Sequence, residues 1–68
     1  MRYAAVIGRT VNGFSAYVPD LPGCVAAGDT RAATEALIRE AVAEHLEVLR
    51  ESGDVAPEPQ ASTSLVEV

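Results

Sequence analysis

The sequence predicts an α+β domain with the element order β-β-β-α-β. Three observations carry this prediction. Short strand-like segments separated by turn residues fill the first 28 positions. A single long helical pattern then runs from about residue 31 to residue 52. A short apolar segment at residues 63–68 follows and is expected to form the last strand. With 68 residues there is room for one domain, which spans residues 1–68.

The first three strands are expected to form an antiparallel meander. The segment "RYAAVIGRTV" predicts a first strand at residues 2–11, with apolar side chains on both of its faces. Asn12-Gly13 is a hairpin signal, because both residues tolerate a positive φ. "FSAYVP" predicts the second strand, which Pro19 ends because proline has no N–H to donate to a ladder. "CVAAG", residues 24–28, predicts a short third strand.

The helix from about Arg31 to Ser52 is the clearest element of the sequence. Thr30 or Asp29 is placed to cap its N-terminus, and Gly53 is placed to end it. Glutamates recur along one side, and apolar residues at steps of three and four form a stripe on the other. The stripe consists of Ile38, Ala41, Val42, His45, Leu46 and Leu49, and the glutamates are Glu40, Glu44, Glu47 and Glu51.

One helix covers only one face of a sheet, yet the first strand is apolar on both faces. A strand of that kind is typical of a sheet that is buried on both sides. Another copy of the chain, or a different protein, is therefore expected to cover the second face. After the helix, residues 54–62 form a linker in which Pro57 and Pro59 favour an extended path.

The composition favours an acidic protein-binding domain. Ten acidic residues oppose five arginines, lysine is absent, and the net charge is −5, which disfavours nucleic-acid binding and favours a basic protein partner. A domain of this size is marginally stable alone, so self-association is also expected. The single cysteine excludes an internal disulfide, and no zinc spacing or phosphate-binding glycine loop is present, so no cofactor is expected. No signal peptide or membrane-spanning run is visible, which predicts a cytoplasmic protein.

No catalytic or metal-ligating residues are expected, so the chain is predicted not to be an enzyme. Cys24 lacks an obvious activating group, and His45, the only histidine, falls within the apolar stripe of the helix. Asp20 and Asp29 flank the third strand and are the best candidates for paired carboxylates in a metal-dependent nuclease. The first strand carries no acid, so structural roles are favoured: Asp20 binding amides of its turn, and Asp29 at the helix start.

The stretch "GFSAYVPDLPGCVAAGDT", residues 13–30, resembles the core motif of HicB-like antitoxins. "REAVAEHLEVL" and "PEP" are also similar to the helix and linker of that family, so the resemblance covers residues 3–68. It implies a partial ribonuclease-H-like module with a three-stranded meander, one helix and a fourth strand beside the first. It also implies a partner, a HicA-like toxin, which is a small basic ribonuclease that cleaves mRNA and whose active site the antitoxin covers.

Two departures from the family pattern bear on function. The chain stops at Val68, without the C-terminal DNA-binding domain of longer members, so autorepression by this chain is not expected. Ala32 and Ala33 replace the usual acids after the capping threonine, and Glu35 stands at a commonly apolar position. The expected function is toxin neutralisation. The alternative is a solitary module that forms a dimer or tetramer and has no toxin.

The loop "PDLPGC" is expected to act through its shape and to contribute to a partner surface. In this hypothesis Leu21 is the exposed apolar tip of the loop. The predicted partner-binding residues are Tyr17, Pro19, Asp20, Leu21, Pro22 and Gly23.

Overall fold

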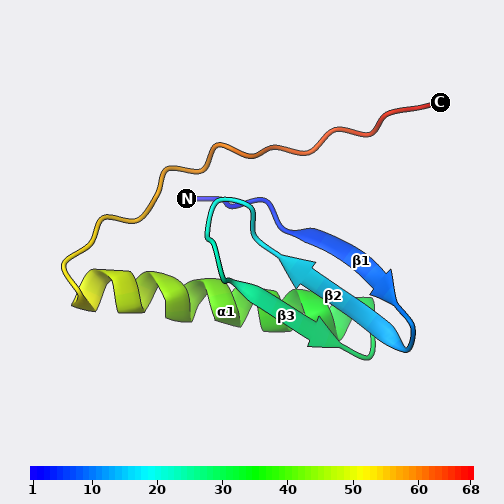
Figure 1. Ribbon diagram of the computed structural model, residues 1–68, viewed down its shortest axis with the longest axis horizontal. Coiled ribbons are helices and arrows are strands. Elements are labelled where there is room, and N and C mark those ends of the chain that lie inside the picture. Colours follow the sequence, from blue (N-terminus) through cyan, green and yellow to red (C-terminus); the bar gives the residue numbers. More distant parts are fainter.

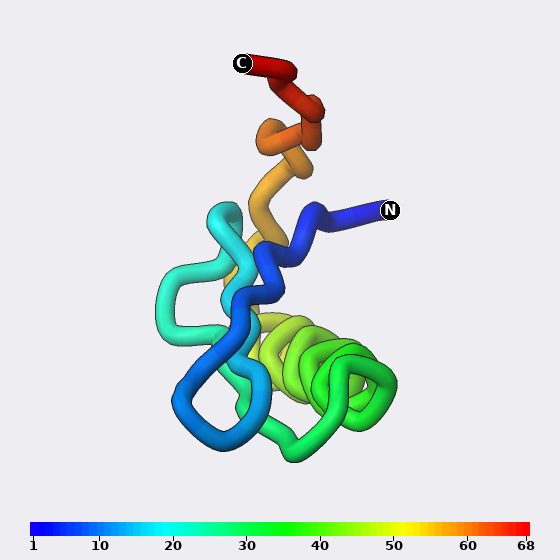
Figure 2. The backbone as a smooth tube through the Cα atoms, turned by 90° about the vertical axis from the view of Figure 1, so that its right-hand side faces the viewer, coloured from blue at the N-terminus to red at the C-terminus, as the bar shows by residue number.

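The computed structural model describes residues 1–68 as a three-stranded sheet with one helix against it (Figure 1). Strands β1 (Val6–Thr10), β2 (Gly13–Tyr17) and β3 (Val25–Gly28) pair antiparallel in the order β1-β2-β3. Helix α1 (Arg31–Glu51) follows β3 and covers one face of the sheet, which Figure 2 shows nearly along the helix axis. The predicted meander and helix are confirmed, with β1 shorter than the predicted residues 2–11.

The register of the strands sets which side chains face α1. Ile7, Ala16 and Ala26 lie opposite one another on adjacent strands and form one row across the sheet. These residues are buried or half-buried against α1. Because side chains alternate along a strand, the next residue on each strand points to the opposite face. The helix-facing row therefore defines an inner face, and the other side of the sheet is called the outer face below.

The first hairpin forms, but its turn is not the one that the sequence predicted. Thr10 pairs with Gly13, so Val11 and Asn12 make the two-residue turn. The only residues with a positive φ are glycines elsewhere in the chain, so Asn12-Gly13 does not use that conformation. Gly13 is required for a different reason. A Cβ at Gly13 would meet the carbonyl oxygen of Gly28 on β3, so the absence of a side chain permits this close approach.

Helix α1 begins and ends as the sequence predicts. Thr30 is the N-cap, and its hydroxyl oxygen accepts a hydrogen bond from the Ala33 N–H at 3.0 Å. At the C-terminus, Gly53 has a φ of +78°, and its N–H donates to the Arg50 carbonyl at 3.1 Å. The N–H of Asp54 donates to the Leu49 carbonyl at 2.9 Å, which completes a Schellman motif.

The predicted stripe of α1 faces the sheet, and it extends one turn further than predicted. Ile38 is buried and the other five stripe residues are half-buried. Thr34, which was not predicted to be in the stripe, is fully buried and donates its hydroxyl to the Thr30 carbonyl at 2.8 Å. A Cβ at Gly28 would lie 2.8 Å from the Thr34 hydroxyl oxygen, so Gly28 permits the helix to approach β3 closely at this point.

The predicted fourth strand is absent from this structure, so β1 is an edge of the sheet. Residues 54–68 form no strand, and Ser62 to Val68 are all exposed. Two hydrogen-bonded contacts hold the earlier part of this tail, including one from the Tyr3 hydroxyl to the Pro57 carbonyl at 2.6 Å. The physical reason lies in the pattern of the segment. Leu65 and Val66 are adjacent, so the apolar residues do not fall on one face, and such a strand gains little from lying beside β1.

Candidate partner-binding surface

The loop between β2 and β3 is built from two successive turns. In the first, the Leu21 N–H donates to the Val18 carbonyl at 3.1 Å, and in the second the Cys24 N–H donates to the Leu21 carbonyl at 3.1 Å. The Val18 N–H donates to the Cys24 carbonyl at 3.1 Å and closes the base of the loop. Every turn in the loop is therefore fixed by backbone hydrogen bonds, which gives it a defined shape.

The sequence of the loop matches the backbone conformation of these turns. Pro19 and Pro22 each occupy the second position of a turn, where the fixed φ of proline is favourable. Gly23 has a φ of +84° at the third position of the second turn, which makes this turn type II. The expectation that the loop depends on shape is thus consistent with its geometry. Pro19, Pro22 and Gly23 are exposed.

Leu21 is not the exposed tip that the sequence suggested, because its side chain is fully buried with 0% exposure. It belongs to the hydrophobic core together with Ala16, Val18, Cys24 and Ile38. The physical reason is that the core is small, so an apolar side chain between two prolines gains more from entering it than from projecting into water. Leu21 is therefore an anchor beneath the loop, while the prolines form its surface.

Asp20 binds the tail rather than the amides of its own turn. Its Oδ2 atom accepts hydrogen bonds from the Gln60 N–H at 3.1 Å and from the Ala61 N–H at 3.0 Å. This contact was not predicted, since it joins residues 40 and 41 positions apart in the sequence. Asp20 precedes β3 in the loop and Asp29 follows the strand, so the two carboxylates do not form a pair at one end of the sheet.

Tyr17 lies on the outer face, where 51% of its surface is exposed. It pairs with Val6 on β1 and with Val25 on β3, so the three side chains form one row across the sheet. Val6 and Val25 are also exposed. The row ends where the loop begins, because Tyr17 is the last residue of β2 and Val25 is the first residue of β3. The outer face thus presents an uncovered apolar row next to the proline-containing loop.

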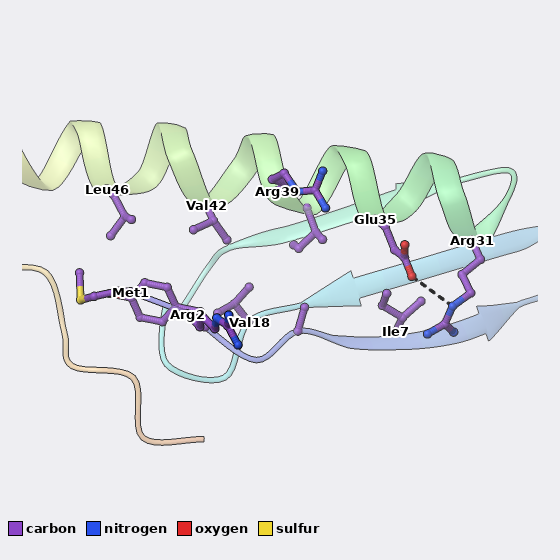
Figure 3. A pocket seen from close by; sticks show the side chains of 12 residues that line it. Met1, Arg2, Ile7, Val18, Arg31, Glu35, Arg39, Val42 and Leu46 are labelled. Atoms are coloured by element: carbon purple, nitrogen blue, oxygen red, sulfur yellow. Dashed lines mark hydrogen bonds and ion pairs between the residues drawn. The ribbon is translucent and has the colours of Figure 1, made fainter. Parts of the chain in front are cut away.

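A concave groove lies between α1 and β1 (Figure 3). Its volume is about 740 Å³, and eight of its 12 lining residues are hydrophobic, including Ile7 and Val42. Arg2, Arg31 and Arg39 also line it, and the Arg31 Nε atom lies 3.2 Å from Glu35 Oε1. Sequence reasoning missed this groove. The available signal was the spacing of residues 31, 35 and 39, which places three charged side chains along one side of the helix.

Cys24 belongs to the hydrophobic core. Its side chain is 4% exposed, and burial raises the pKa of the thiol, which favours the protonated form at neutral pH. His45 lines the same shallow depression as Cys24, a proximity that the sequence did not predict. No group of three or more histidine, cysteine, aspartate or glutamate side chains is arranged to hold a metal ion. The only helix, α1, is too polar to cross a membrane.

A family model and two known proteins are similar to this chain over most of its length. The family model described as "HicB_like antitoxin of bacterial toxin-antitoxin system" matches residues 3–67. A chain from a solved structure, the "HicA3 and HicB3 toxin-antitoxin complex", is similar with a TM-score of 0.74 and 40% sequence identity, over 88% of this chain and 70% of that chain. An uncharacterized 14.9 kDa protein from the rep-hol intergenic region of Haemophilus phage HP1 (strain HP1c1) is 35% identical over 57 residues. The match covers 84% of this chain but only 43% of the phage protein.

Proposed function

Because the chain belongs to the family of HicB-like antitoxins, we propose that it binds a small basic ribonuclease toxin of the HicA type and neutralises it by covering the active site. In this proposal the chain has no chemistry of its own. The observation that carries the proposal is the structural similarity to a chain of the HicA3 and HicB3 complex, since it combines a TM-score of 0.74 with 40% identity. The match extends over 88% of this chain.

The charge distribution supports a basic partner. Four glutamates, Glu40, Glu44, Glu47 and Glu51, are exposed along α1, and only Glu47 has an ion-pair partner, Arg50. Surface carboxylates in a chain of net charge −5 attract a basic protein over distances of about one Debye length, roughly 8 Å at physiological salt. The proposed role of this acidic side of α1 is to increase the rate at which the toxin associates.

The loop is the proposed contact surface for the toxin. Pro19 and Pro22 are exposed on a backbone that internal hydrogen bonds already fix. A rigid surface loses little conformational entropy on binding, so each contact contributes more of its gross energy to affinity. Leu21 supports this surface from within the core, and Asp20 holds the tail beside it. The proposal has three further parts. The chain associates with itself into a dimer or tetramer, it acts in the cytoplasm, and its sheet and helix form a ribonuclease-H-like module.

The experiment that tests the proposal is co-expression of this chain with the product of any small basic reading frame adjacent to its gene. Growth rescue together with a complex of defined mass in light scattering is the expected result. Pro22→Arg should weaken the complex, because it places a positive charge on the surface that meets the basic toxin. Pro57→Arg is the matched control, since it makes the same exchange at another exposed proline and should preserve rescue.

Two outcomes would contradict parts of this proposal. Absence of both rescue and complex, with the chain folded, would refute toxin neutralisation. It would favour the alternative of a solitary self-associating module, which the uncovered apolar row of the outer face also supports. Rescue that survives Pro22→Arg as well as Pro57→Arg would retain the antitoxin function but would exclude the loop as its contact surface.

A further inference from the structure

The groove between α1 and β1 carries a charge opposite in sign to that of the whole chain. Three of the five arginines line the groove, together with only one of the ten acidic residues. That acidic residue, Glu35, forms an ion pair with Arg31, whereas neither Arg2 nor Arg39 has an ion-pair partner. The groove is therefore a cationic site on an acidic protein.

The N-terminal end of α1 adds to the positive potential of the groove. The first turn of the helix contains no acidic residue, and Ala32 and Ala33 follow Arg31 there. The partial positive charge of a helix N-terminus is usually balanced by acids in the first turn. Without such acids, the arginines and the helix terminus favour an anion on the same side of the molecule.

The helix wall of the groove changes from charged to apolar along its length. Val42 and Leu46 follow Arg39 at steps of three and four residues, so the three side chains lie on one side of α1. Figure 3 shows the Arg31–Glu35 pair at one end of this wall and Leu46 at the other. The helix rises about 10 Å between Arg39 and Leu46. The wall is thus cationic at one end and apolar over the following two turns.

These properties indicate a small amphipathic anion as the occupant. A basic protein would be repelled by the arginines, so the groove does not suit the toxin of the proposed function. A nucleic acid would gain from the arginines but not from a lining in which eight of 12 residues are hydrophobic. The volume of about 740 Å³ lies within the range of roughly 300–1,000 Å³ that is typical of small-molecule sites.

We propose that the groove binds a small apolar carboxylate, with the carboxylate held by Arg2 and Arg39 and the alkyl chain along Val42 and Leu46. Arg39 belongs to α1 and Arg2 precedes β1, so the two guanidinium groups come from opposite walls of the groove (Figure 3). The alkyl chain would cover half-buried apolar side chains and remove their remaining surface from water. This site is independent of toxin binding.

The test titrates decanoate into the full chain by isothermal titration calorimetry at low ionic strength. Binding at sub-millimolar concentration is expected, since a ligand of this size has few atoms with which to gain affinity. Arg39→Gln should weaken binding about two- to fivefold, which is the range for an exposed ion pair. Arg50→Gln is the matched control, because it removes the same charge from an exposed arginine outside the groove, and it should leave binding unchanged.

A second ligand separates the charge of the head group from the apolar chain. Decylamine has the same alkyl chain and the opposite charge. It should bind more weakly than decanoate, even though the net charge of −5 attracts cations to the chain as a whole. Far-UV circular dichroism verifies that each variant is folded. If Arg39→Gln does not fold, Arg2→Gln replaces it, since Arg2 is exposed and should have a similar effect.

Three results would overturn the proposal. Decanoate could fail to bind at any concentration up to the millimolar range. It could bind no better than decylamine, or lose the same affinity in Arg39→Gln and Arg50→Gln, and the groove arginines would then not hold the carboxylate. It could bind only to Leu65→Ser, which would assign the groove to the exposed tail of the chain itself. Growth rescue by Arg39→Gln as complete as that of the wild-type chain is expected, and it separates this inference from the proposed function.

Discussion

Leu21→Ala is expected to lower the free energy of unfolding by about 3 kcal/mol, because Leu21 is fully buried in a loop of fixed shape. Leucine-to-alanine changes in cores cost about 2–5 kcal/mol, and the hydrogen-bonded turns on both sides limit how far the site can collapse. A chain of 68 residues has a total stability of roughly 3–10 kcal/mol, at about 0.05–0.15 kcal/mol per residue. The substitution therefore removes a large share of that total.

The assay is thermal unfolding followed by circular dichroism at one protein concentration, since self-association makes the melting temperature depend on concentration. At about 4–8 °C per kcal/mol for a domain of this size, the expected decrease is roughly 12–24 °C. Leu65→Ala is the matched control, because Leu65 is fully exposed, and it should change stability by less than about 0.5 kcal/mol. Equal melting temperatures for the two variants would refute the assignment of Leu21 to the core.

Thr30→Ala removes the N-cap of α1 and should lower the free energy of unfolding by about 1 kcal/mol in urea denaturation, whereas Thr63→Ala in the exposed tail should not. Asp20→Ala removes the acceptor of the amides at residues 60 and 61, so hydrogen exchange of these two amides should accelerate with little change in melting temperature. Burial raises the pKa of the Cys24 thiol, so the folded chain retains this proton to a higher pH than the unfolded chain does. The thiol therefore contributes its full stabilisation below its ordinary pKa, and this stabilisation is lost as the pH rises toward the raised pKa. Urea titrations at increasing pH should show this decrease in the free energy of unfolding for the wild-type chain but not for Cys24→Ala.

Each of these expectations has a result that would contradict it. Equal urea midpoints for Thr30→Ala and Thr63→Ala would show that the cap contributes nothing to stability. Unchanged exchange in Asp20→Ala would mean that the tail amides are protected by something other than the carboxylate. An alkaline decrease in stability that persists in full in Cys24→Ala would have to originate from another group.

Local signals explain why the helix was predictable in detail. The Thr30 cap, the apolar stripe and Gly53 each act within a few residues, so the sequence contains all the information that places α1. The sequence predicts that the first hairpin forms, but it does not predict the backbone conformation of its turn. Gly13 serves a contact with β3 rather than a positive φ, and that contact depends on residues 15 positions away.

The features that sequence reasoning missed depend on tertiary contacts. Leu21 was assigned to the surface because a leucine between two prolines carries no periodic pattern that indicates burial. The acceptors for the tail amides and the groove between α1 and β1 arise from segments that are distant in sequence. The final strand was predicted from a short apolar segment, residues 63–68, whose alternation is only partly in phase. Its formation, however, depends on a partner strand and on an apolar face, which residues 63–68 do not present in this structure.

The hydrogen bonds that Tyr3 and Asp20 make with the tail affect the order in which the chain is expected to fold. Sequential strands and a helix that directly follows β3 give the body mainly local contacts, which favour fast folding. The bonds from Tyr3 to Pro57 and from Asp20 to Gln60 close loops of 54 and 40 residues for little free energy. We therefore expect these bonds to form after the transition state, so that their loss would accelerate unfolding without slowing folding. The tail is then expected to be the last segment to join the fold and the first to leave it.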